Sequence, residues 1–174
     1  MFPNPLHPAV VHFPIVLMLL LPVIACVALW AIHRGVNTRR AWSLPLIGAA
    51  ALALSSWMAV ATGKNDSERV ERVVSEQPVE THEESAELFF ALSGVLLVAV
   101  SAGMIRGTIG RSARGIATAG AFALAVAGVR VGHTGGQLVY RHGAAAAYSD
   151  SASTRAIAKP GTHAGEAGGE VRER

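Results

Sequence analysis

Histidines border the apolar stretches of this chain, and imidazole is both a common metal ligand and a usual axial ligand of haem iron. Of the seven histidines, two lie at the start of the first apolar stretch, one precedes the third and two follow the fourth. These five are His7, His12, His82, His133 and His142. Haem in a helical bundle needs two imidazoles from different helices at similar depth, whereas a non-haem metal ion takes three or four ligands in a tighter cluster. The spacing therefore predicts either a haem or a metal site.

Three of the five histidines are candidate ligands of haem iron or of a non-haem metal ion. They are His12, His82 and His133, each expected near the outer end of a different helix. The sequence leaves open which two would be axial, although His12 and His133 are favoured because they reach a similar depth. His7 and His142 lie further out, where they suit a second ligand role or hydrogen bonds to haem propionates.

Arginines and glycines beside the fourth stretch can complete a haem site. Arg130 and Arg141 are natural propionate partners, because a guanidinium pairs both oxygens of a carboxylate. Gly135 and Gly136 would let a large planar ligand approach, or would let the backbone turn sharply so that residues 138–142 fold back over the bundle mouth. The alternative is purely structural: interfacial histidines, arginines that reach the lipid headgroups, and glycines that only punctuate a helix.

Four apolar stretches must position these residues, and each has about the twenty residues that a bilayer requires. They run over residues 13–32, 42–62, 88–105 and 116–132. Pro14 is expected to interrupt the helical hydrogen bonding beside His12. The fourth stretch is rich in small residues, which suit close helix packing inside a bundle rather than lipid contact. The sequence predicts an all-α fold, an integral membrane four-helix bundle.

Composition supports a membrane protein and excludes several other classes. Apolar residues make up 51% of the chain and charged residues only 16%, with long stretches that carry no charge. The net charge of +3 comes without a basic face beside aromatic residues, which argues against nucleic-acid binding. Cys26 is the only cysteine, so disulfides, cysteine zinc sites, iron–sulfur clusters and covalent haem attachment are not expected. It is interpreted as a packing residue. The N-terminus has no basic residue before its apolar run, so it is not expected to be a signal peptide.

Charge in the connections predicts the orientation. Residues 33–41 and 106–115 contain several arginines and no acid, so the positive-inside rule places both in the cytoplasm. The opposite side receives the acidic residues 66–87. Both termini are then extracytoplasmic.

The outer connection and the tail have patterns of their own. Residues 66–77 are predicted to form a short helix with Val70, Val73 and Val74 on one face. Residues 81–84 have the T-x-x-E pattern of a capping box that opens the third helix. The membrane domain is expected to cover residues 1–143, and residues 144–174 to be a disordered tail.

Two longer motifs resemble a known family. Residues 7–15 are similar to the opening H-P-x-x-V-H-F-P-I of the bacterial membrane family called domain of unknown function 2231, and residues 132–143 resemble its closing G-H-x-G-G-x-L-V-Y-x-H-G. Thr62-Gly63 and His82-Glu83 are weaker matches. The resemblance implies four helices without an established activity. It also implies a redox setting by association, because members can occur with cytochrome c or Rieske-type partners.

The leading hypothesis is a b-type cytochrome-like electron carrier. Its haem would lie near the outer face and exchange electrons with a quinol or a periplasmic cytochrome. A second haem is not expected, because only His33 lies at the cytoplasmic end. The alternatives are a membrane anchor or assembly subunit of a respiratory complex and a non-haem metal-binding protein. A metal or proton transporter is disfavoured, because the centres of the spans contain no Asp or Glu. A homo-oligomer remains an option.

Overall fold

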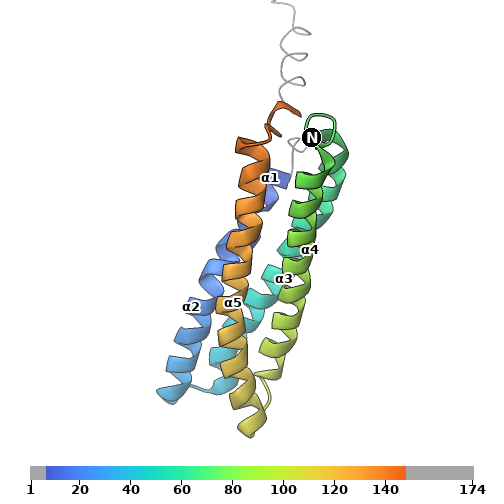
Figure 1. Cartoon of the computed structure of the whole chain (residues 1–174). Coiled ribbons are helices and arrows are strands. Elements are labelled where there is room, and N and C mark those ends of the chain that lie inside the picture. The colour runs from blue at the N-terminus through green and yellow to red at the C-terminus, as the bar shows by residue number, and fades with distance from the viewer. Residues whose placement is uncertain (1–6, 148–174) are drawn as a thin grey trace, which may run out of the picture.

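The computed structural model describes residues 7–147, and within them the chain forms helices and no strands. The all-α prediction is confirmed (Figure 1). The elements are α1 (His7–Val10), α2 (His12–His33), α3 (Thr38–Val70), α4 (Glu76–Ala102) and α5 (Gly107–Tyr140).

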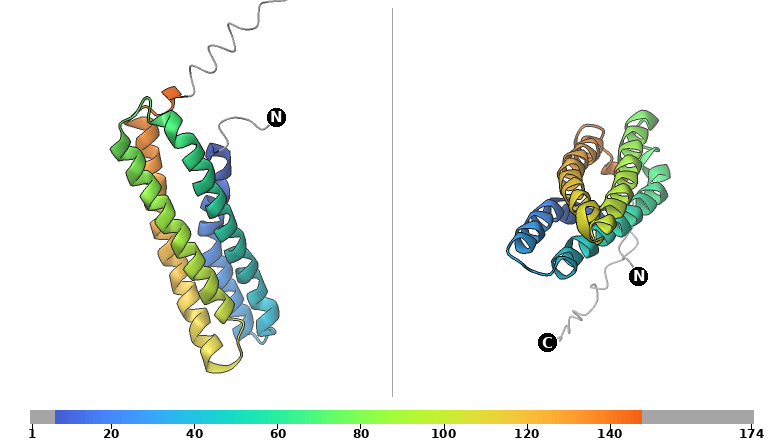
Figure 2. Two further views of the ribbon diagram at one scale, coloured as in Figure 1. Left: turned by 90° about the vertical axis from the view of Figure 1, so that its right-hand side faces the viewer. Right: turned by 90° about the horizontal axis from the view of Figure 1, so that it is seen from below.

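The four long helices run up and down side by side. Each packs on the helix that follows it in the chain, and α2 closes the bundle against α5 (Figure 2). The α2–α3 and α4–α5 connections lie together at one end, whereas α1, the α3–α4 connection and the end of α5 lie at the other (Figure 1). The first will be called the arginine end and the second the histidine end, after the side chains that gather there.

Each long helix can cross a membrane by its length and composition. Large apolar side chains cover the outside of the bundle; Val126 is 73% exposed and Val98 is 70% exposed. In water such a surface would aggregate, whereas lipid tails solvate it. Cys26 is exposed as well, so its interpretation as a packing residue is wrong. The chain is a multi-pass membrane protein.

Small residues let α5 approach its neighbours closely. Gly128 is buried against the side chains of Met18 and Phe89, and a Cβ atom at Gly128 would collide with the Met18 sulfur. Lipid tails are as apolar as the helix surfaces, so the hydrophobic effect does not hold the helices together. The van der Waals contacts of such close packing do so instead. The expected role of the small residues in packing is confirmed along this buried face, although the opposite face of α5 is exposed.

Two buried donors bind backbone carbonyls at the end of α4, where the last carbonyls of a helix have no intrahelical partner. Trp42 is fully buried, and its indole N–H donates to the Val100 carbonyl at 2.9 Å. Arg114 is 7% exposed, and its Nη1 donates to the Gly103 carbonyl at 2.7 Å. Arg114 therefore lies inside helix α5, and not in a free connection as the sequence suggested.

The histidine end differs from the sequence analysis in two helix boundaries. Residues 66–70 continue α3 and residues 71–75 form a turn, so the short helix predicted over residues 66–77 is wrong. The T-x-x-E capping box is also wrong, because α4 already begins at Glu76 and the Thr81 hydroxyl donates to the Gln77 carbonyl inside the helix. The capping pattern misleads because Pro78 occupies the first turn of α4, where its missing N–H would have no helical partner.

Helix α5 passes straight through Gly135 and Gly136 and ends at Tyr140, so the sharp turn predicted at these glycines is wrong. The chain turns instead at Gly143, which has φ +70°. Ala144 then packs in a buried cluster with Val74, Val79 and Leu138. The boundary at residue 143 and the disordered tail stay predictions. The rest of the tail, including His163, lies outside the described residues.

Candidate functional site

Two histidines that lie 75 residues apart in the sequence meet at the histidine end. His7 is the first residue of α1, and His82 lies in the second turn of α4. Their ring centroids are 6.5 Å apart and their planes are 80° apart. Both side chains are half-buried. The backbone stays helical through Val11, which donates to the His7 carbonyl, and Pro14 removes only the N–H that would bind the Val10 carbonyl. Helix α1 packs on α3.

His7 is held by α3 through one ring nitrogen. Its Nδ1 lies 3.0 Å from the Ala59 carbonyl and 3.4 Å from the Thr62 hydroxyl oxygen. A carbonyl only accepts, so Nδ1 carries the proton and donates it. In the neutral ring the other nitrogen, Nε2, then has a free lone pair.

His82 is held in the same way by α5. Its Nδ1 lies 3.0 Å from the Thr134 hydroxyl oxygen, and that hydroxyl donates its own proton to the Val131 carbonyl at 3.0 Å. Thr134 must therefore accept from His82, and Nδ1 of His82 is the donor. The consequence matches that for His7: Nε2 of His82 is left free to bind a metal.

A glycine lies against each of the two rings. A Cβ atom at Gly63 would lie 3.1 Å from Cε1 of His7, and one at Gly135 would lie 3.0 Å from Cε1 of His82. These separations are tighter than ordinary contact, so a larger residue would push the ring. Gly63 and Gly135 thus let two helix backbones approach the imidazoles. Gly136 has no comparable neighbour, because nothing lies within 4 Å of the position of its Cβ.

An unpaired acceptor lies beside the pair in sequence. Oε1 of Glu83 is buried and has no hydrogen-bond partner. One turn further along α4, Glu87 forms an exposed ion pair with Lys64 of α3, with 2.6 Å between Oε1 and Nζ. A buried carboxylate oxygen without a donor is costly, and an orphan of this kind calls for an explanation such as a group bound at the site.

The structure does not bring the other predicted histidines into this pair. His12 and His133 are both exposed, and Nε2 of His133 lies 2.8 Å from the Gln137 side-chain nitrogen. His142 is exposed on a separate cavity of about 200 Å³ that also borders Thr134 and Gln137. Arg130 and Arg141 are exposed on the last turns of α5 and just after it. His33 lies at the arginine end.

The number of ligands bears on the kind of metal site. Within residues 7–147, no group of three or more His, Cys, Asp or Glu side chains is placed to hold a metal ion. His12, His82 and His133 in particular are not gathered into such a group. The arrangement offers two imidazoles in edge contact, with planes 80° apart.

Apart from Gly135, sequence reasoning did not assign the residues that hold and surround the pair. Thr62 ends the second apolar stretch, Gly63 follows it, and Thr134 stands within the closing G-H-T-G-G motif. Glu83 stands directly after His82. The position of these residues in or beside the motifs was the available signal, because nothing in their type alone distinguishes them from helix punctuation.

Comparison with known proteins identifies the family of the chain. The model of a family described as predicted membrane protein (DUF2231) matches residues 3–147. No curated protein and no solved structure matches the chain. The match covers both histidine motifs and all four long helices, and the chain belongs to the DUF2231 family of predicted membrane proteins.

Proposed function

We propose that the protein is a b-type cytochrome-like electron carrier of the membrane, with His7 and His82 as the axial ligands of a single haem iron. The observation that carries this proposal is the pair itself. Two imidazoles from different helices make an edge contact, and each uses Nδ1 in a hydrogen bond that leaves Nε2 free. Metal-bound histidines are held in this way, because the second-shell bond fixes the ring and raises its basicity.

The separation of the rings fits one metal ion between them. A metal bound at ~2.0 Å from one nitrogen of each imidazole separates the ring centroids by roughly 6 Å. The observed separation is 6.5 Å. The distance between the centroids is therefore close to the one that two ligands of a single ion would have.

The ligand count favours haem over a bare metal ion. The porphyrin supplies four nitrogens, so haem iron needs only two ligands from the protein. A non-haem site for zinc, copper or iron takes at least three protein ligands. Two imidazoles without a third ligand in the described part of the chain match the first requirement.

Haem would supply a reversible one-electron change at its iron, and the protein would hold and tune it. Thr134 and the Ala59 carbonyl orient the two imidazoles, while Gly63 and Gly135 let two helix backbones pack against the rings. Arg130, Arg141 and His142 lie towards the same end and are the side chains available for propionates. A quinol or a periplasmic cytochrome or Rieske-type protein is the proposed redox partner.

The proposed orientation places the histidine end outside the cytoplasm in a bacterial inner membrane, because the arginines of both opposite connections have no acid beside them. A reporter that works only in the cytoplasm should be active when fused after Thr38 and inactive when fused after Gly143. A periplasmic reporter at the same two positions is the control and should give the reverse. Cytoplasmic activity only after Gly143 would invert this orientation.

Haem and metal content test the proposed cofactor. The protein purified in detergent from haem-sufficient cells should contain about one extractable haem b per chain, with iron in the same ratio. Stoichiometric zinc or copper without haem would contradict the proposal and favour a metal-binding protein. A colourless, metal-free protein would contradict it too, and would favour the membrane-anchor alternative.

A further inference from the structure

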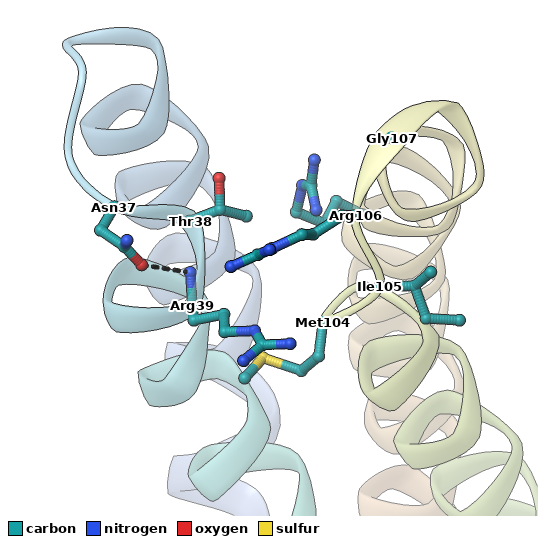
Figure 3. Close-up of a pocket in the computed structure, with 8 residues that line it drawn as sticks. Asn37, Thr38, Arg39, Met104, Ile105, Arg106 and Gly107 are labelled. Atoms are coloured by element: carbon teal, nitrogen blue, oxygen red, sulfur yellow. Dashed lines mark hydrogen bonds between the residues drawn. The ribbon is translucent and has the colours of Figure 1, made fainter.

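A second site lies at the arginine end, on the far side of the bundle from the histidines. A cavity of about 170 Å³ opens between the α2–α3 connection and the α4–α5 connection. Asn37, Thr38 and Arg39 line it from one connection, and residues 104–107 line it from the other, together with Arg114 of α5. Figure 3 shows the two sets facing each other across the opening, with Ile105 pointing away. A water molecule needs on the order of 10–15 Å³ of such space, so a phosphate group fits.

Positive charge around this cavity is not neutralised by the protein. Arg39, Arg106 and Arg114 line it, and Arg34, Arg40 and Arg111 lie at the same end of the bundle. The sequence has no Asp or Glu before Asp66 and none between Glu87 and Asp150. Among the described residues, the side chains of Arg39 and Arg106 donate no hydrogen bond and form no ion pair. Arg114 uses one nitrogen on the Gly103 carbonyl, which fixes its guanidinium in place.

The backbone adds positive character at the same place, because two helices begin there. Helix α3 begins at Thr38, where the Asn37 side chain already accepts from the N–H groups of Arg39 and Arg40 (Figure 3). Helix α5 begins at Gly107 and has no side-chain cap. The first N–H groups of α5 therefore have no acceptor in the helix, and the start of a helix favours an anion.

We propose that this cavity binds a phosphate group, held by the guanidiniums of Arg39 and Arg106 and by the start of α5. Arginine suits phosphate because its planar fork donates two parallel hydrogen bonds. Basic pockets between helix ends at a membrane surface bind the headgroups of anionic phospholipids, which is the nearest source of phosphate to this site. Free phosphate in solution has the same chemistry, and the two sources are separated by the test below. The site does not depend on haem or on the function of the histidine end.

The test measures how ligands raise the thermal unfolding temperature of the full-length protein in detergent. Phosphatidylglycerol should protect the protein more than phosphatidylcholine with the same acyl chains. Arg106→Gln and Arg39→Gln should weaken this selective effect roughly tenfold in lipid concentration, because each removes a charge-assisted hydrogen bond. The matched controls are Arg111→Gln and Arg40→Gln, which remove the same charge at the same end without lining the cavity; they should change the effect by about twofold at most.

Adding inorganic phosphate, with chloride at the same ionic strength as the control, distinguishes free phosphate from a lipid headgroup as the ligand. Protection by the lipid alone, lost in Arg106→Gln and Arg39→Gln, assigns the site to a headgroup. Protection by inorganic phosphate with the same loss assigns it to free phosphate. Equal protection by both lipids with no effect of phosphate would overturn the proposal. Equal losses in all four variants would also overturn it, because the effect would then be a diffuse response to charge.

Discussion

His7→Ala and His82→Ala are each expected to remove haem from the purified protein or to leave it high-spin. Each change deletes one of the two imidazoles whose Nε2 atoms are free, and no third His, Cys, Asp or Glu among the described residues joins them as a ligand group. The measurement is haem content and the optical spectrum of each variant after the same purification. Added imidazole should restore a low-spin spectrum to whatever haem the variants retain, because it can occupy the space of the deleted ring.

His12→Ala and His133→Ala are the matched controls. Both side chains are exposed, so the variants should keep haem and a low-spin spectrum, although the sequence alone favours this pair. Loss of haem from His12→Ala and His133→Ala, with full retention in His7→Ala and His82→Ala, would return the ligands to the pair suggested by the sequence.

Gly110→Ala is expected to destabilise the bundle, since the Ile105 carbonyl of the α4–α5 connection occupies the position where the new Cβ atom would lie. The obstacle is backbone, so it cannot be relieved by rotating a side chain. Overpacking of this kind costs about 1–3 kcal/mol, and the connection must move away from α5. The measurement is the midpoint of thermal unfolding in detergent.

Gly115→Ala provides the control for Gly110→Ala. Gly115 lies in the same helix, is exposed, and has nothing within 4 Å of the position of its Cβ. Alanine is the better helix former, by about 1 kcal/mol. Gly115→Ala should therefore leave the unfolding temperature unchanged or raise it. Equal unfolding temperatures for the two variants would show that the close approach at Gly110 does not matter.

The fold could be predicted from sequence because its dominant signal is a run of about twenty apolar residues, which local details do not obscure. Four charge-poor stretches of bilayer length define four helices whatever their detailed packing. The ends of these helices were less predictable. Helix α3 runs eight residues beyond Thr62 to Val70, through Gly63. A glycine and polar residues usually suggest an end, but here Gly63 is needed in the helix because the His7 ring lies against it.

The site could be predicted only as a group of histidines at one end. The depth of each histidine in the membrane could be inferred from its position relative to the apolar spans, but the direction in which each side chain points could not. His7 contacts α3 and His82 contacts α5, and these partners depend on how the helices are rotated against one another. Helix α4 also begins earlier than the capping pattern indicated. A rotation of one residue changes the face of a helix by about 100°, so these small shifts decide which imidazoles meet.

The absorption spectrum of the wild-type protein in detergent, recorded oxidised and then reduced with dithionite, tests two-imidazole haem ligation most directly. Haem iron held by both His7 and His82 would be low-spin, so the reduced protein should show a sharp α-band of a b-type cytochrome. A high-spin spectrum would contradict ligation by two imidazoles. A protein that binds no haem, even when purified from cells with abundant haem, would contradict the proposed function altogether.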